Sequence, residues 1–434
     1  MLRALPALLA LLLLAGCLNA TPSGPLGADP VRSDATIPRL QVVAFTDSGI
    51  NPYQEAFAAS PAFEQRMAAT VNASYTTLQL STNGTLADRM KADAPVLQSL
   101  KPGQLYHFAG TRILAISFLN RSNSLSPEKH VILDDVGHGT ETSSLVARAD
   151  PDSLIVMAQV EAQICDDGRC PFDPSVAEAL KWIAAQPWTD LISISMGVPG
   201  APPDSPAAHP EMQTFLDASR AASSQGKLVV IAAGNLPNPT LTGYTAGPPW
   251  VIAVGGYEMA NRGESATASK GVDVIANFTA LVAAPNATNG TVWTGGTSFS
   301  TPTVAGTFSR ALGIVRAEAA KNGTRDLRLH ATDPDPRHSA KAYRDAMNAS
   351  AVMIQATDYD PTATPGNETP LDRALAPAVP IVSPTQEGWG AVYEGLAQEI
   401  ATRVLSGNLA PSSEKASTAQ VQAEWQAARE AYWP

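Results

Sequence analysis

The stretch Gln41-Val42-Val43-Ala44-Phe45-Thr46-Asp47-Ser48-Gly49 decides the fold class of this chain. Its apolar part is a short run of the kind that a parallel strand buried on both faces shows, and it stops at a turn signal. Similar runs recur, and segments with helical spacing lie between them. The runs are 154–158, 191–195, 228–232 and 251–254, and the helical segments are 174–186 and 211–224. This alternation predicts an α/β fold with three layers, a mostly parallel central sheet with helices on both faces.

Polar motifs lie where such a sheet places an active site, at the carboxyl ends of its strands. Asp47 directly follows the first run, and Ala232-Ala233-Gly234-Asn235 follows the run 228–232. Two further motifs are Asp135-Val136-Gly137-His138-Gly139-Thr140 and Gly295-Gly296-Thr297-Ser298-Phe299-Ser300-Thr301-Pro302. The last motif opens an Ala-rich helical stretch to about Lys321, so Ser298 is expected on a first helical turn. The helix dipole there stabilises developing negative charge.

These residue types supply the parts that peptide-bond hydrolysis needs, which are a nucleophile, a base, a group that orients the base and donors for the oxyanion. Ser298 can be the nucleophile, and His138 can take its proton and return it to the leaving amine. Asp47 would hold the His138 tautomer. Asn235 can donate its side-chain amide to the oxyanion, with the Ser298 backbone N–H as the second donor. We expect Ser298 Oγ, His138 and Asp47 in hydrogen-bonding sequence beside the Asn235 amide, and we interpret Asp134 and Asp135 as structural.

The chain order Asp, His, Asn, Ser, with these local sequences, resembles the subtilisin-like serine proteases. The matching motifs are Asp-Ser-Gly at 47–49, Gly-His-Gly-Thr at 137–140, Ala-Ala-Gly-Asn at 232–235 and Gly-Thr-Ser-x-x-x-Pro at 296–302. The resemblance covers about residues 40–405. It implies the subtilisin-like fold and a serine endopeptidase with the triad Asp47, His138 and Ser298, and with Asn235 in the oxyanion hole.

The same resemblance assigns a substrate-binding segment. Ser195, Met196 and Gly197 would pair with the substrate backbone and line its primary pocket together with Ala233 and Gly234. These walls are small or apolar, so we predict a preference for apolar side chains, and peptides or proteins as substrates. The competing interpretation is a surface-anchored binding module on the same fold with little or no turnover. An esterase of another class is disfavoured, because Ser298 lies in Thr-Ser-Phe and not in Gly-x-Ser-x-Gly.

Three features depart from the family pattern. Asp47 and His138 are 91 residues apart, which predicts a surface insertion at about 51–130. Only 23 residues, 18–40, separate Cys17 from the first strand, where the family usually has a folded propeptide, so the enzyme folds unaided or with a helper in trans. Glu141-Thr142-Ser143-Ser144 after the His138 motif is more polar than usual, and Thr303 stands where the family often has His.

The N-terminus predicts export. Arg3 precedes the apolar run 4–15, about 12 residues, which is too short to span a bilayer and has the length of a signal-peptide core. Leu14-Ala15-Gly16-Cys17 resembles the lipobox of prokaryotic lipoproteins, which implies a lipid on Cys17 and anchoring in the membrane. The predicted organisation is a signal peptide at 1–17, a flexible tether at 18–39, the catalytic domain at 40–405 and a helical extension at 406–434. The protein would lie on the outer face of the cytoplasmic membrane, or be secreted if the signal is an ordinary one.

The remaining cysteines and the sequons fit an exported protein. Cys165 and Cys170 flank Asp-Asp-Gly-Arg and are predicted to form a disulfide, with free thiols as the alternative. Ten Asn-x-Ser/Thr sequons indicate an exported, glycosylated surface. They lie at Asn19, Asn72, Asn83, Asn120, Asn277, Asn286, Asn289, Asn322, Asn348 and Asn367.

Composition limits the partners. The net charge of −11 and the absence of a basic patch argue against nucleic acid, since phosphate binding needs clustered Lys and Arg. The chemistry requires no cofactor. Calcium is common in the family, but no ligand cluster in the sequence matches a site, so no metal is assigned. We expect the catalytic domain to be monomeric.

Overall fold

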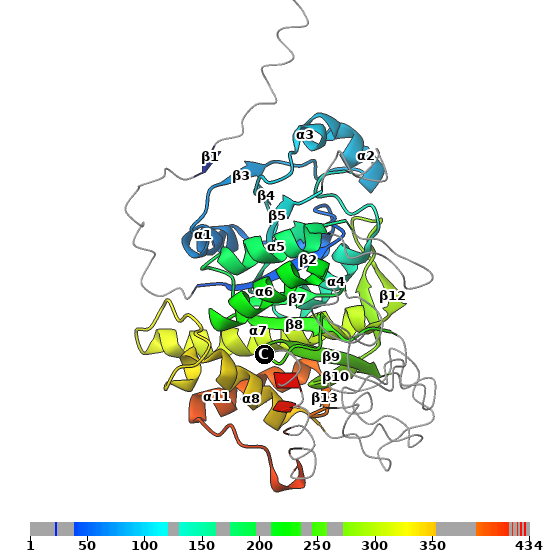
Figure 1. Ribbon diagram of the computed structural model, residues 1–434. Coiled ribbons are helices and arrows are strands. Elements are labelled where there is room, and N and C mark those ends of the chain that lie inside the picture. Colours follow the sequence, from blue (N-terminus) through cyan, green and yellow to red (C-terminus); the bar gives the residue numbers. More distant parts are fainter. Residues whose placement is uncertain are drawn as a thin grey trace, which may run out of the picture.

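A single large sheet runs through the middle of the molecule, from β1 and β3 at one end to β13 at the other (Figure 1). The computed structural model describes residues 22–23, 39–119, 130–161, 174–196, 210–235, 245–257, 272–352, 388–415, 419, 423, 426–427 and 429–430. Within these residues the sheet has 11 strands in the order β1-β3-β4-β5-β6-β2-β7-β8-β9-β10-β13. The strands are β1 (Pro22–Ser23), β2 (Gln41–Asp47), β3 (Tyr75–Leu78), β4 (Tyr106–Phe108), β5 (Ile113–Ser117), β6 (Ser153–Gln159), β7 (Leu191–Ile194), β8 (Leu228–Ala232), β9 (Ile252–Tyr257), β10 (Val274–Asn277) and β13 (Ala391–Val392).

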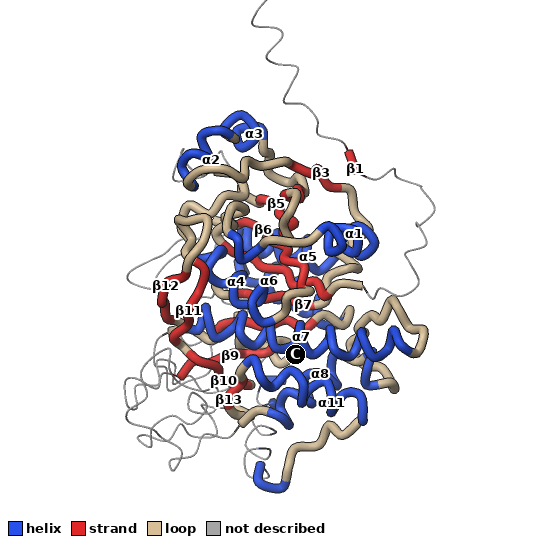
Figure 2. The backbone as a smooth tube through the Cα atoms, turned by 180° about the vertical axis from the view of Figure 1, so that it is seen from behind, coloured by secondary structure: helices blue, strands red, loops and turns tan. Residues whose placement is uncertain are grey.

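Parallel pairing dominates this sheet. All neighbours from β5 to β13 pair in parallel, as do β3 and β4, while β1 with β3 and β4 with β5 are antiparallel. A separate antiparallel hairpin, β11 (Thr279–Ala283) and β12 (Thr291–Gly295), lies to one side of the sheet in both views (Figures 1 and 2). The predicted α/β class with a mostly parallel sheet is therefore confirmed.

Helices cover both faces of the sheet. One face packs against α5 (Pro174–Ala185) and α6 (Pro210–Ser224), and the other against α4 (His138–Ala149), α7 (Thr297–Lys321), α8 (Ala340–Ser350) and α11 (Ala397–Ser406). The remaining helices are α1 (Pro61–Thr70), α2 (Leu86–Ala92) and α3 (Ala94–Ser99). Short 3-10 turns are η1 (Glu55–Phe57), η3 (Pro336–His338), η5 (Glu394–Leu396) and η6 (Ser413–Lys415).

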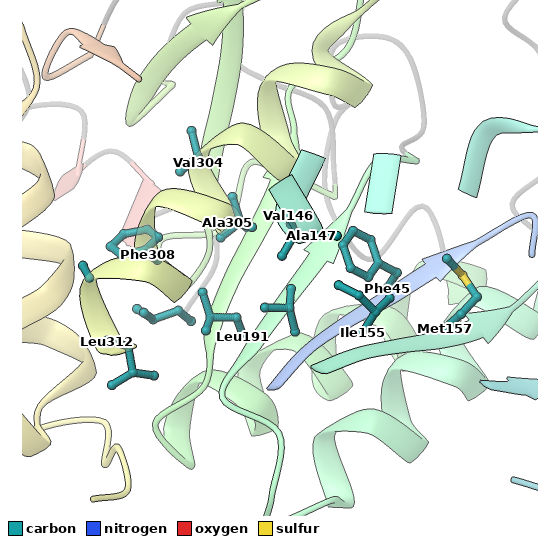
Figure 3. Close-up of a cluster of buried hydrophobic side chains, with 14 of the residues drawn as sticks. Phe45, Val146, Ala147, Ile155, Met157, Leu191, Val304, Ala305, Phe308 and Leu312 are labelled. Atoms are coloured by element: carbon teal, nitrogen blue, oxygen red, sulfur yellow. The ribbon is translucent and has the colours of Figure 1, made fainter. Parts of the chain in front are cut away.

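Strand β2 shows why a continuous apolar run in the sequence was the best indicator of the fold class. Val43 and Phe45 point into the cluster formed with α4 and α7, whereas Val42 and Ala44 point into the cluster formed with α5 and α6. Successive side chains of a strand face opposite sides, so a strand covered on both faces must be apolar throughout. Figure 3 shows the first cluster, with side chains of α7 facing those of the sheet. The α7 side chains are Val304, Ala305, Phe308 and Leu312, and the sheet side chains are Phe45, Ile155 and Leu191.

Residues 51–119, within the expected insertion, contribute to the sheet as well as to the surface. Strand β5 lies between β4 and β6, and all five of its residues are buried. Its sequence Ile-Leu-Ala-Ile-Ser is another short apolar run, so the pattern that revealed the other strands was present here too. Figure 1 shows α2, α3 and β3 at the end of the molecule opposite α8, α11 and β13.

Two buried cations bind the C-terminal extension to the end of α8 and to the segments that precede β9, β10 and β13. Lys415 Nζ donates to the backbone carbonyls of Asn348, Ala351 and Trp389. Arg429 is buried and donates to the Gly247 carbonyl, to further carbonyls before β9, and to the Asp273 carboxylate. Within the helical extension expected at 406–434, η6 is a 3-10 turn, and the described residues from 419 to 430 are helical.

Several sequence expectations fall outside the described residues. These are Cys17, most of the tether 18–39, Gly197, the pair Cys165 and Cys170, and the sequons at Asn19, Asn120 and Asn367. Five other sequon asparagines are exposed, namely Asn72, Asn83, Asn286, Asn289 and Asn322, and two are half-buried, Asn277 and Asn348. Within the described part of the chain, none of the helices combines the length and the apolar character that a membrane span requires.

Candidate active site

Three neighbouring strands deliver polar residues to one edge of the sheet. Strands β2, β7 and β8 are adjacent and parallel, so their carboxyl ends lie side by side. Asp47 ends β2, Ser195 directly follows β7, and Asn235 lies three residues after β8. The sheet topology therefore brings together residues that are far apart in the sequence, at the edge where α/β proteins form their sites.

Asp47 and His138 form a hydrogen-bonded pair at this edge. His138 is the first residue of α4, and its Nδ1 lies 2.7 Å from Asp47 Oδ1. Asp47 is buried and also accepts from the Ser48 backbone N–H at 2.7 Å and from Thr142 Oγ1 at 3.0 Å. A carboxylate so held keeps the Nδ1 proton on the imidazole, which leaves Nε2 as the nitrogen that can act as a base.

The close approach of α4 to β2 depends on a glycine. A Cβ atom at Gly139 would overlap the carbonyl oxygen of Gly49 and press on the Cβ of Asp47. Any larger residue there would push the first turn of α4 away from the turn after β2. Gly139, the second glycine of Gly-His-Gly-Thr, thus sets the distance between His138 and the Asp47 carboxylate.

Ser298 lies on the first turn of α7, but its hydroxyl is not hydrogen-bonded to the histidine. Among the described residues its Oγ donates to the Ser195 backbone oxygen at 3.0 Å, and the expected hydrogen bond to His138 is not formed. His138 is nevertheless close, because its ring centroid lies 5.7 Å from that of Phe299, the next residue after Ser298.

Pro302, one turn after Ser298 on α7, explains why Ser195 bonds to Ser298. Pro302 has no N–H to donate to the Ser298 carbonyl, which would be its partner in a regular helix. Ser195 Oγ fills this place and donates to the Ser298 carbonyl at 2.8 Å. The two serines are therefore linked by a reciprocal pair of hydrogen bonds, which ties the end of β7 to the start of α7.

Asn235 caps α7 from outside the helix. The N-cap residue Gly296 has no side chain, and Asn235 Oδ1 instead accepts from the Thr297 backbone N–H at 2.9 Å and from Thr297 Oγ1 at 2.8 Å. Because Oδ1 is engaged with Thr297, the amide nitrogen of the same group is oriented away from these donors. Asn235 is exposed, so its N–H groups are available to a ligand at this edge.

The pKa of His138 is set by opposing effects. Burial lowers the pKa, but the Asp47 carboxylate raises it through charge and hydrogen bonding, and the charges of Asp134 and Glu141 raise it further. The outcome is a pKa of about 9. The pKa of Glu141 is raised, and burial is the largest cause. The charges of Asp134 and Asp47 raise this pKa further, while the charge of His138 lowers it.

The expected substrate-binding residues take different positions. Ser195 and Gly234 lie at the sheet edge, and Met196 is half-buried and packs against the cluster under α5 and α6. Ala233 is buried in a small cluster with Tyr257 and Val272. Gly197 lies outside the described residues. Within the described chain no group of three or more His, Cys, Asp or Glu is arranged to hold a metal ion.

Sequence reasoning gave no contacts for several residues that hold this site, although it interpreted one of them, Asp134, as structural. Ser48, Thr142 and Asp134 all contact the Asp47–His138 pair or the turn that carries it. For Asp134 a signal existed, because an Asp shortly before a helix start is a common capping residue. The partners of Ser48 and Thr142 could not be read from local sequence.

Comparison with known proteins matches the chain to one family. The Subtilase family matches residues 39–374. Solved structures with a similar course of the chain include the prenylagaramide maturation protease PagA, at 14% identity over 86% of this chain and 96% of that one, with a TM-score of 0.44. Another is a lanthipeptide protease, at 17% identity over 83% of this chain and 87% of that one, with a TM-score of 0.46. A comparison with curated protein sequences gave no match. The match to the family spans well over half of the sequence, and the chain therefore belongs to the subtilase family of serine-type endopeptidases.

Proposed function

We propose that this chain hydrolyses peptide bonds with Ser298 as nucleophile, His138 as general base and acid, and Asp47 as the group that orients His138. The observation that carries this proposal is the 2.7 Å contact between the buried Asp47 carboxylate and His138 Nδ1, at the edge where α7 presents Ser298. A buried carboxylate paired with a partly exposed imidazole next to a helix N-terminus is the arrangement that acyl transfer requires.

The reaction would begin when Ser298 Oγ leaves the Ser195 carbonyl and turns to His138 Nε2. The serine oxygen attacks the substrate carbonyl carbon while Nε2 takes its proton, and a tetrahedral oxyanion forms. Asn235 N–H and the Ser298 backbone N–H would donate to this oxyanion. Collapse breaks the C–N bond, and the imidazolium gives its proton to the leaving amine. Water then hydrolyses the acyl-enzyme with His138 again as base.

A fluorophosphonate probe tests the nucleophile directly. The wild-type chain is expected to label and to cleave a mixed peptide library, and Ser298→Ala to do neither. Ser300→Ala is the matched control, because Ser300 Oγ is buried and donates to the Ala276 and Asn277 carbonyls, two residues from the nucleophile. Labelling that survives Ser298→Ala would place the nucleophile elsewhere. A wild type that neither labels nor cleaves would favour the alternative of a binding module on the same fold.

Substrate choice and location belong to the same proposal. The small or apolar residues at the expected pocket support a preference for apolar side chains in peptides or proteins, and strict cleavage after Arg or Lys would refute it. The N-terminal pattern ending at Cys17 supports export and a lipid anchor. Mass spectrometry of the membrane fraction would detect the lipidated Cys17 peptide, and an unmodified peptide in the culture medium would contradict anchoring.

The pH dependence follows from the His138 environment. The base must be neutral to accept the serine proton, and a raised pKa keeps it protonated to higher pH. With a pKa of about 9, kcat/KM is expected to rise about tenfold per pH unit from pH 6 and to level off above about pH 9. A profile of kcat/KM between pH 5 and 10.5 measures this. A plateau that begins below pH 7 would show that the neighbouring carboxylates do not raise the pKa of His138.

A further inference from the structure

Asp134 makes an unusual set of contacts for a residue that the proposed chemistry does not use. Its Oδ1 accepts from Ser48 Oγ and from the Gly137 backbone N–H, both at 2.7 Å. Its Oδ2 accepts from the Thr140 backbone N–H and from Thr140 Oγ1, also both at 2.7 Å. Both oxygens are thus fully engaged, and two of the four donors are backbone N–H groups at the start of α4, the helix that begins with His138.

Ser48 connects this cap to the aspartate of the pair. Its backbone N–H donates to Asp47 Oδ1, its Oγ donates to Asp134, and the same Oγ accepts from the Gly139 backbone N–H at 2.9 Å. The residues on either side of His138 in the sequence are therefore both held, Gly137 by Asp134 directly and Gly139 through Ser48. The contacts extend from the end of β2 to the first turn of α4 without passing through the imidazole.

The loop that carries Asp134 is itself held in place. Gln159, at the end of β6, donates from Nε2 to the carbonyls of His130 and Leu133, and its Oε1 accepts from the Ile132 N–H. Ile132 has a φ of 73°, a conformation that costs a β-branched residue energy and persists only where the surroundings impose it. The sheet, through Gln159, therefore holds the loop that carries Asp134.

We propose, on the basis of the function proposed above, that Asp134 is a positioning residue that holds His138 at the distance and angle at which its Nδ1 meets Asp47 and its Nε2 can meet Ser298. Asp134 touches neither the substrate nor the reacting atoms. Its removal would let the first turn of α4 move relative to β2. Because a displacement of about 1 Å in such a group can cost about 100-fold in rate, we expect an effect of that order on kcat.

Three acidic side chains near His138 allow geometry to be separated from charge. Asp134→Asn keeps the size of the side chain but removes the capacity to accept all four hydrogen bonds, and it also removes a charge. Glu141→Gln removes a charge that acts on His138 from α4 without cutting any contact of Asp134. Asp135→Asn is the matched control, because the neighbouring Asp135 is exposed and accepts from the N–H and Nδ1 of His130, away from the pair.

The experiment measures kcat and KM as a function of pH for the full chain and these variants. Asp134→Asn is expected to lower kcat about 100-fold on the alkaline plateau, where His138 is neutral in every variant, with KM near the wild-type value. Glu141→Gln is expected to shift the rising limb to lower pH and to reach the wild-type plateau. Asp135→Asn should match the wild type. If Asp134→Asn reached the wild-type kcat on the alkaline plateau and only its rising limb shifted in pH, Asp134 would act by charge alone. That result would overturn the positioning role.

A second variant protects the test against a folding defect. If Asp134→Asn fails to fold by circular dichroism, Ser48→Ala decides, since it cuts the link between Asp134 and Gly139 but leaves the contacts of Asp134 to Gly137 and Thr140. It should lower the plateau kcat by a smaller factor than Asp134→Asn, and an unchanged plateau would contradict the proposal. A wild-type chain that neither cleaves peptides nor labels with a fluorophosphonate would overturn the proposed function itself, which is a distinct outcome.

Discussion

Replacement of Asp47 by asparagine is expected to lower kcat by about 10⁴-fold while the fold is retained. An amide presents an N–H group where the carboxylate accepts, so it cannot hold the Nδ1 proton of His138 in the same way. The imidazole then favours the tautomer with the proton on Nε2, which cannot take a proton from Ser298. The imidazolium that forms during the reaction also loses the charge that stabilises it.

Single-turnover and steady-state kinetics on a chromogenic peptide would measure this loss. Thr142→Val is the matched comparison, because it removes one donor to Asp47 Oδ2 and leaves the carboxylate and the His138 contact in place. We expect its effect on kcat to be far smaller than that of Asp47→Asn. If Asp47→Asn kept more than a tenth of the wild-type kcat, Asp47 would not orient the base, and the Asp47–His138 contact would be structural.

The largest effect on stability is expected at the opposite end of the strands, where Arg316 on α7 binds Asp190. Both side chains are buried, and the guanidinium contacts the two carboxylate oxygens at 2.8 and 2.7 Å. Burial opposes the ionisation of Asp190, but Arg316 and then Arg39 hold its pKa below the ordinary value. Arg316 also donates to the carbonyls of Leu40 and Leu327, so it joins β2 to the segment after α7.

Arg316→Met is expected to lower the free energy of unfolding by about 3–5 kcal/mol, because it leaves a buried carboxylate without its main partner. Urea unfolding followed by circular dichroism measures the change. Arg328→Ala is the matched control, since Arg328 pairs with Asp326 on the surface, where an ion pair contributes about 0–1 kcal/mol. If the two variants lost equal free energies of unfolding, burial would not make the Arg316–Asp190 pair contribute more than a surface ion pair.

Most of the fold could be predicted from short apolar runs. The runs at 154–158, 191–195, 228–232 and 251–254 correspond to β6, β7, β8 and β9, and the Ala-rich helix begins and ends close to where its sequence indicates. These elements are predictable because burial on both faces forces a continuous apolar sequence, which is a local property. The strands within 51–119 were harder to recognise, because polar loops and short helices separate them.

The candidate site was predictable to the level of residue identity but not of contacts. Local motifs singled out Asp47, His138, Asn235 and Ser298, and the structure brings these residues to one edge of the sheet. The orientation of Ser298 was not predictable. It depends on Ser195, which is 103 residues away, and on a proline that deprives the Ser298 carbonyl of its helical donor.

The sequence by itself determined the strands and helices that continuous apolar runs and helical spacing mark, the α/β class and the residues with the right chemistry for peptide hydrolysis. Each of these depends on side chains within about ten positions of one another. Only the tertiary structure decided that Thr142 donates to Asp47, that Asn235 caps α7, and that Lys415 and Arg429 bind the C-terminal extension to α8 and to the segments before β9, β10 and β13. These contacts join segments whose proximity is created by sheet order and by burial. A donor finds its acceptor there because an unpaired polar group inside the protein is costly, and not because the two are neighbours in sequence.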